Sequence, residues 1–98
     1  MTRRVGEAVL IGSSRCPLAR VVVEELTPST AAFRIRTADR GPSRVAVLGA
    51  DAELVVAEIE DAAVTMRVFE LRGDRVRLAF EGPSRIDIHR EEVARPVQ

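Results

Sequence analysis

The most constraining feature of this sequence is a strict alternation of apolar and polar residues toward its C-terminus. The alternation runs through residues 74–81 and resumes after a Gly-Pro-Ser turn at residues 82–84. Its apolar positions are Val76, Leu78, Phe80, Ile86 and Ile88. A period of two is what a half-buried strand requires. The pattern predicts strands over residues 74–80 and 85–88, and the acids that follow indicate a helix over residues 90–95.

An internal repeat extends this pattern to the rest of the chain. The tetrapeptide Gly-Pro-Ser-Arg occurs at residues 41–44 and at 82–85, and each copy is preceded by strand-like segments and followed by an alternating one. Such self-similarity indicates a duplicated unit. Two separate domains of about 45 residues would each bury too little surface to be stable. We therefore predict one all-β domain of two intertwined antiparallel sheets, a single-chain pseudo-dimer with a short C-terminal helix.

The predicted pseudo-dimer consists of a degenerate repeat, residues 1–50, and a better-preserved repeat, residues 51–98. Further strands are expected at residues 2–5, 8–11, 18–26, 31–37, 44–48 and 63–71. Residues 51–63 are ambiguous, because their alanines and glutamates favour a helix whereas the preceding repeat has a strand at the equivalent place. We predict a strand there. The alternative architecture is a single module with an inserted segment that still forms a homodimer.

Charge and composition exclude several classes of function. The chain has 98 residues, with 15 basic residues, all arginine, and 15 acidic ones. A net charge of zero predicts no global attraction to nucleic acid or membranes, so any polyanion site must be a local patch. Cys16 is the only cysteine and His89 the only histidine, and no Gly-rich phosphate loop is present. We expect no catalytic residues, no metal and no cofactor.

The N-terminal region carries no secretory signal, and no apolar run is long enough to span a membrane. A cytoplasmic location is therefore expected.

Two motifs at opposite ends of the chain resemble those of one known family. Residues 2–7 read Thr-Arg-Arg-Val-Gly-Glu, and residues 86–93 read Ile-Asp-Ile-His-Arg-Glu-Glu-Val. In combination they resemble the opening and closing motifs of the carbon storage regulator family, small bacterial RNA-binding translational regulators. The resemblance implies an intertwined all-β fold. It also implies binding of GGA-containing single-stranded or hairpin-loop mRNA near ribosome-binding sites.

The resemblance further implies a composite RNA site, in which the first strand of one half meets the last strand of the other. Carried over, the RNA-binding residues are Thr2, Arg3, Arg4, Arg85, Ile88, His89 and Arg90. The reciprocal site would use residues 47–50 in place of the His-Arg-Glu run and would face residues 51–56. That neighbourhood is acidic and lacks arginine, so it should repel RNA. We expect one working RNA site per chain, and a monomer.

Each candidate residue also has a structural interpretation. Arg3 and Arg4 would be solvated charges, His89 a locally bonded strand-end residue, and Arg90 the ion-pair partner of a neighbouring glutamate. Two functions follow. The first is a translational regulator whose partners are mRNA or small regulatory RNA with GGA motifs, with no DNA and no membrane. The second is a paralogue that keeps the fold, has lost RNA binding, and acts through protein-protein interaction, for example with a protein antagonist.

Overall fold

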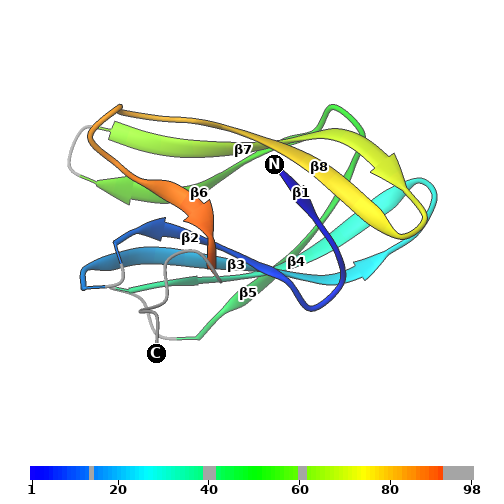
Figure 1. Cartoon of the computed structure of the whole chain (residues 1–98), viewed down its shortest axis with the longest axis horizontal. Helices are drawn as coiled ribbons and strands as arrows, with labels where there is room; N and C mark the ends of the chain where they lie inside the picture. Colours follow the sequence, from blue (N-terminus) through cyan, green and yellow to red (C-terminus); the bar gives the residue numbers. More distant parts are fainter. Residues whose placement is uncertain (14, 39–41, 60–61, 92–98) are drawn as a thin grey trace.

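A computed structural model of the chain describes residues 1–13, 15–38, 42–59 and 62–91. Figure 1 shows strands stacked in two layers. The strands are β1 (Thr2–Arg3), β2 (Ala8–Gly12), β3 (Pro17–Leu26), β4 (Thr30–Thr37), β5 (Arg44–Gly49), β6 (Glu53–Ile59), β7 (Ala62–Arg72), β8 (Arg75–Glu81) and β9 (Ile88–Arg90). The ambiguous segment is thus a strand, β6, as predicted. Within the described ranges, the structure contains no helix with the length and apolar character that a bilayer crossing needs.

The strands form two antiparallel sheets that exchange their outer strands. The four-stranded sheet has the order β1-β8-β7-β6, and the five-stranded sheet has the order β5-β4-β3-β2-β9. The N-terminal strand β1 therefore completes the sheet of the C-terminal half, and the last strand β9 joins the sheet of the N-terminal half. The predicted fold class, all-β with two intertwined antiparallel sheets, is confirmed.

The core lies between the two layers and is mainly aliphatic. Side chains alternate across a strand, so every second residue of β3, β4, β7 and β8 points inward. The largest fully buried side chains are Phe33, Ile11, Ile35, Met66, Val9, Val21, Val23, Val56, Val64, Val68 and Val76. Phe33 is the one aromatic residue among them, and it belongs to a cluster of buried residues from both sheets. The core thus binds the two sheets into one unit.

The last strand begins later than the sequence pattern predicted. Residues 85–88 were expected to form it, but the N–H of Ile86 donates to the carbonyl of Pro83 at 3.0 Å, which continues the turn. β9 then pairs with β2, with Ile88 opposite Ile11 and Arg90 opposite Val9. Arg90 was placed at the start of a helix, and it instead ends a strand. The rest of the predicted helix lies mostly outside the described residues.

The turn after β1 recurs 45 residues later in the chain. Residues 4–7 form a turn closed by a backbone hydrogen bond of 2.9 Å between its ends, and its third residue, Gly6, has a φ of 88°. Residues 49–52 form the same turn with a closing bond of 3.2 Å, and its third residue, Asp51, has a φ of 67°. Gly6 and Asp51 therefore occupy corresponding places, although glycine adopts such a φ more readily than aspartate does.

The hydrogen bonds that hold these turns give the same spacing. The N–H of Gly6 donates to the carbonyl of Val23 at 2.8 Å, and the N–H of Asp51 donates to that of Val68 at 2.7 Å. A β-bulge follows directly after Val23 in β3 and directly after Val68 in β7. Since turns, bonds and bulges all agree, β5 occupies in the five-stranded sheet the place that β1 occupies in the four-stranded sheet.

The 45-residue spacing corrects the alignment of the two halves that the tetrapeptide repeat predicted. The two copies of Gly-Pro-Ser-Arg predicted that residues 45–47 correspond to the last strand. That correspondence is wrong, because β5 pairs with β4 at a sheet edge just as β1 pairs with β8. Val47, Leu48 and Gly49 stand at the places of Thr2, Arg3 and Arg4. The division into repeats 1–50 and 51–98 stays a prediction.

Candidate nucleic-acid interface

A hollow lies where the first strand of one half meets the last strand of the other. It has a volume of about 380 Å³ and is lined by Met1, Thr2, Ile88, His89 and Arg90. Four of the seven predicted RNA-binding residues therefore lie together. The hollow is built by two sheet-edge strands, β1 and β9.

The edge strand β1 is fixed to β8 by its first residues. The amino group of Met1 donates to the carbonyl of Leu78 at 2.9 Å, and the N–H of Leu78 donates to the carbonyl of Met1 at 2.7 Å. Thr2 lies opposite Arg77 on β8. Arg77 is exposed, and its guanidinium lies 5.5 Å from the ring centroid of Phe69. The place of Arg77 beside Thr2 depends on the strand exchange, which brings β1 onto β8.

The other edge strand, β9, is held by pairing with β2 and by an ion pair at its end. His89 lies opposite Leu10. Arg20 on β3 binds both carboxylate oxygens of Glu91, and its Nη2 donates to Oε1 at 3.0 Å. This hydrogen bond, together with the charge of Glu91, raises the pKa of Arg20 although burial acts in the opposite direction. The pair offsets the negative charge of Glu91, the residue after Arg90, and fixes the end of β9.

His89 lines the hollow and also carries a polar atom without a partner among the described residues. Its Nε2 is buried, and no described residue gives this atom a hydrogen-bond partner. A buried polar atom without a partner costs about 1–3 kcal/mol, which a ligand that bonds to it would recover. The interpretation of His89 as a locally bonded strand-end residue finds no support at this nitrogen.

Arg90, the next residue on β9, brings a cation to the lining of the hollow. Its side chain is exposed and makes no ion pair with any described residue. Glu91, the neighbour considered as its partner, binds Arg20. Arg90 can therefore offer its planar guanidinium and all its N–H donors to an anion or a base.

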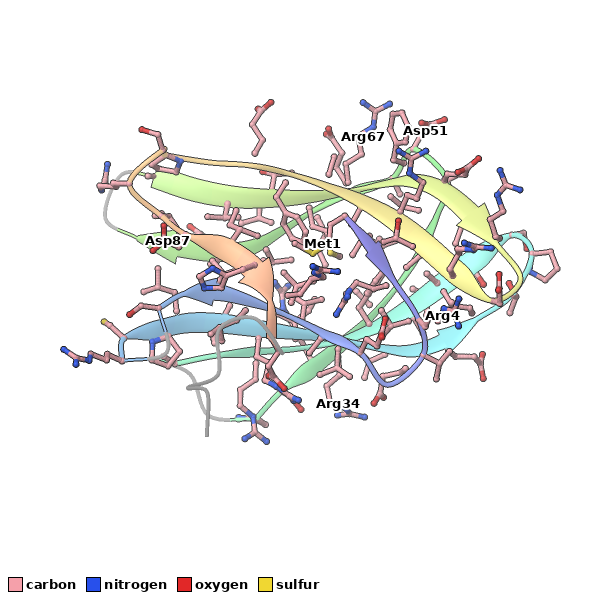
Figure 2. All side chains as sticks on the ribbon, in the orientation of Figure 1. Met1, Arg4, Arg34, Asp51, Arg67 and Asp87 are labelled. Carbon is pink, nitrogen blue, oxygen red and sulfur yellow. The ribbon has the colours of Figure 1, made fainter. Side chains whose placement is uncertain are left out.

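Arg4 and Arg85 lie near the hollow in the sequence but do not line it. Arg4 is exposed in the turn after β1, where its backbone N–H donates to the carboxylate of Glu7 at 2.8 Å. Figure 2 shows Arg4 at this turn and Met1 at the other end of β1. Arg85 is exposed in the turn before β9. Both add positive charge around the site without forming its walls.

Arg3 lies inside the protein and not on the candidate surface. Only 3% of it is exposed. Its Nε donates to the carbonyl of Thr2 at 2.8 Å and lies 3.8 Å from the carboxylate of Glu7. Its Nη1 donates to the carbonyl of Ala8 at 3.4 Å. Arg3 is therefore neither a solvated charge nor part of the hollow, and it supports β1 from beneath.

A model of the global regulator protein family CsrA matches residues 51–98 of the chain. Through these residues the chain belongs to the CsrA family. No solved structure matches it. CsrA proteins are RNA-binding post-transcriptional regulators, so the chain is a regulator of this class and RNA is its partner. The match covers β6 to β9, which includes the β9 wall of the hollow.

The opposite corner of the molecule differs from the hollow in both of its strands. On β5, exposed Val47 replaces Thr2 of the CsrA-like opening motif, and Leu48 and Gly49 replace its two arginines. In the four-stranded sheet no described strand pairs with the outer side of β6. In the five-stranded sheet, β9 pairs with the outer side of the corresponding strand, β2. The exposed Asp51 nearby pairs with Arg67 at 3.0 Å (Figure 2). This corner therefore has β5, which lacks the opening motif, in the place of β1, and no described strand in the place of β9.

Proposed function

We propose that the chain controls translation or mRNA stability by binding GGA-containing single-stranded or hairpin-loop RNA near ribosome-binding sites. The RNA binds in the hollow between β1 and β9. The observation that carries this proposal is that His89 and Arg90 line one hollow, where the Nε2 of His89 has no hydrogen-bond partner and Arg90 no ion-pair partner among the described residues. Together they offer a hydrogen bond and a cation to one ligand.

The chemistry of these groups suits unpaired bases. Proteins read single-stranded RNA by stacking on planar side chains and by hydrogen bonds to exposed base edges. The chain has no tyrosine or tryptophan, so the planar group is the guanidinium of Arg90, which can also bond to O6 and N7 of guanine. Because β1 and β9 are both edge strands, their outer backbone N–H and C=O groups are available to base edges as well.

One RNA should bind per chain. Phosphate binding depends on local cations, because the chain has no net charge. The opposite corner has Val47 where the hollow has Thr2, and no described strand stands there in the place of β9. We infer that the chain acts as a monomer with a single site.

The test is titration of a GGA hairpin, with the same hairpin carrying a scrambled loop as the control. We expect a mobility shift with the GGA loop and a much weaker one with the scrambled loop. Calorimetry should give one RNA per chain. Two equivalent RNAs per chain would contradict the single-site proposal, and equal shifts with both loops would contradict GGA recognition.

A second candidate function is regulation through protein-protein contacts without RNA binding. The zero net charge and the acids of residues 51–61 favour it. The same assay separates the two functions, since this candidate predicts no shift with either hairpin.

A further inference from the structure

The outer side of β6 is an open strand edge at a place where the other sheet has a strand. β2 and β6 correspond through the 45-residue spacing, so Leu10 on β2 corresponds to Val55 on β6. β9 covers β2, with His89 opposite Leu10. Among the described residues no strand covers β6. Because β9 covers β2 and no described strand covers β6, only 8% of Leu10 is exposed but 39% of Val55 is.

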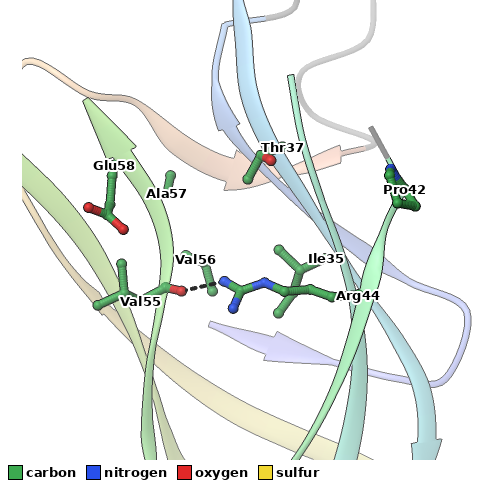
Figure 3. A pocket seen from close by; sticks show the side chains of 8 residues that line it. All are labelled: Ile35, Thr37, Pro42, Arg44, Val55, Val56, Ala57 and Glu58. Atoms are coloured by element: carbon green, nitrogen blue, oxygen red, sulfur yellow. Dashed lines mark hydrogen bonds between the residues drawn. The ribbon is translucent and has the colours of Figure 1, made fainter. Parts of the chain in front are cut away.

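A cavity of about 350 Å³ lies along this open edge. Figure 3 shows its walls, formed by β6 on one side and by β4 and β5 on the other. The lining residues are Ile35, Thr37, Pro42, Arg44, Val55, Val56, Ala57 and Glu58. Ile35 and Val56 are fully buried core residues. The cavity therefore has an apolar floor that can take an aliphatic side chain, as the β2 side takes Ile88.

Arg44 spans the open edge and bonds to one of its backbone groups. Its Nη2 donates to the carbonyl of Val55 at 2.7 Å (Figure 3). This carbonyl therefore points away from β7. In an antiparallel pair both backbone groups of a residue point to the same side, so the N–H of Val55 faces the open edge too. Val55 thus turns its donor and its acceptor toward the open edge, and a strand that adds there takes the place of the Arg44 guanidinium at the carbonyl.

The charges along β6 select the kind of strand. Glu53 and Glu58 are exposed, and neither forms an ion pair with a described residue. β6 itself carries no basic residue. A strand that adds here is favoured if its side chains facing these two glutamates are basic.

We propose that the open edge of β6 docks an extended segment of a protein partner, which adds as an antiparallel strand in the way that β9 adds to β2. The segment carries a branched aliphatic residue that enters the cavity over Ile35 and Val56. It also carries basic residues that face Glu53 and Glu58. Main-chain hydrogen bonds supply affinity in this mode of recognition, and the side-chain pockets supply specificity. The site is separate from the RNA hollow and does not depend on RNA binding.

The probe is a synthetic peptide derived from the chain's own last strand. A peptide of residues 84–91 carries the pattern that pairs with β2, and Asp87→Lys with Glu91→Lys adapts its charge to β6. Hydrogen exchange of the full chain, read by NMR, should show a fast-exchanging Val55 amide that saturating peptide slows at least tenfold. The peptide with its natural acids should bind more weakly.

Two variants connect binding to this edge. Val55→Pro removes the outward N–H, and proline is tolerated where the N–H of an edge strand faces solvent. It should abolish peptide binding and leave GGA-hairpin binding unchanged. Glu58→Lys leaves the backbone intact, so it remains informative if the proline variant does not fold. Glu58→Lys should weaken binding of the basic peptide and strengthen binding of the peptide with its natural acids.

Three results would overturn the proposal. The first is a Val55 amide already protected in the free chain at all concentrations, since the chain itself would then cover the edge. The second is protection that grows with protein concentration, because the occupant would then be a second copy. The third is saturable peptide binding that leaves the exchange of Val55 unchanged.

Discussion

Replacing Arg90 tests the RNA proposal most directly, because the structure predicts opposite effects for Arg90 and for Arg44. Arg90 is exposed and makes no ion pair with a described residue. Arg90→Ala therefore leaves no protein group unpaired and should change the free energy of unfolding by less than about 0.5 kcal/mol. Arg44→Ala removes a hydrogen bond to the carbonyl of Val55. It should reduce stability by about 0.5–1.5 kcal/mol.

The effects on RNA affinity should be reversed. An arginine that reads a guanine edge contributes about 1–3 kcal/mol of discrimination. Its loss in Arg90→Ala should weaken binding of the GGA hairpin by about 5- to 150-fold, at 1.4 kcal/mol per tenfold change. Binding of the scrambled hairpin should change much less. Arg44 lies at the opposite corner, so Arg44→Ala should leave RNA affinity unchanged.

The assay is a fluorescence titration with both hairpins at several salt concentrations, accompanied by urea unfolding of each variant. If Arg90 contacts only phosphate, its loss weakens the binding of both hairpins alike. The slope of log K against the logarithm of the salt concentration then falls in magnitude by about 0.7 for the lost contact. Such a result would contradict base reading by Arg90. Equal losses of affinity in Arg90→Ala and Arg44→Ala, with folding intact, would refute the assignment of a single RNA site.

The remaining predictions concern assembly and stability. Light scattering at micromolar concentration should give the mass of one 10.7 kDa chain, and a stable dimer would contradict the monomer proposal. Phe33→Ala should lower the free energy of unfolding by about 3–5 kcal/mol in urea titrations, since Phe33 is fully buried. Gly12→Ala should destabilise the fold and weaken RNA binding, because the new Cβ would lie 2.7 Å from a backbone oxygen and Gly12 bonds to Asp87 just before β9. Arg20→Ala should weaken RNA binding in the same titration, and adding Glu91→Gln should restore part of it by removing the released negative charge.

The sequence predicted the fold class well because its strands alternate clearly. The apolar positions of β4, β7 and β8 are every second residue, and a period of two has few other structural meanings. The true repeat spacing was hidden, because Asp51 holds the left-handed backbone position that Gly6 holds in the first half. Gly-Pro-Ser-Arg was the visible repeat, but it lies in turns and does not set the strand register.

The candidate site was predicted in part for a similar reason. Thr2, Ile88, His89 and Arg90 meet as the family resemblance implied. The burial of Arg3 follows from the register of β1 on β8, which a run of three polar residues does not indicate. Arg20 supports β9 across β2, and this arrangement becomes visible only when the order of the strands is known.

The bond between Met1 and Leu78 also bears on the synthesis of the chain. These residues are 77 positions apart. At about 5–20 residues per second, β1 leaves the ribosome about 4–15 s before the strand on which it lies. Contacts this distant in sequence slow folding, because a long loop must close before they form. β1 and β9 reach their partner strands only after almost the whole chain has been made, so the hollow forms among the last parts of the molecule.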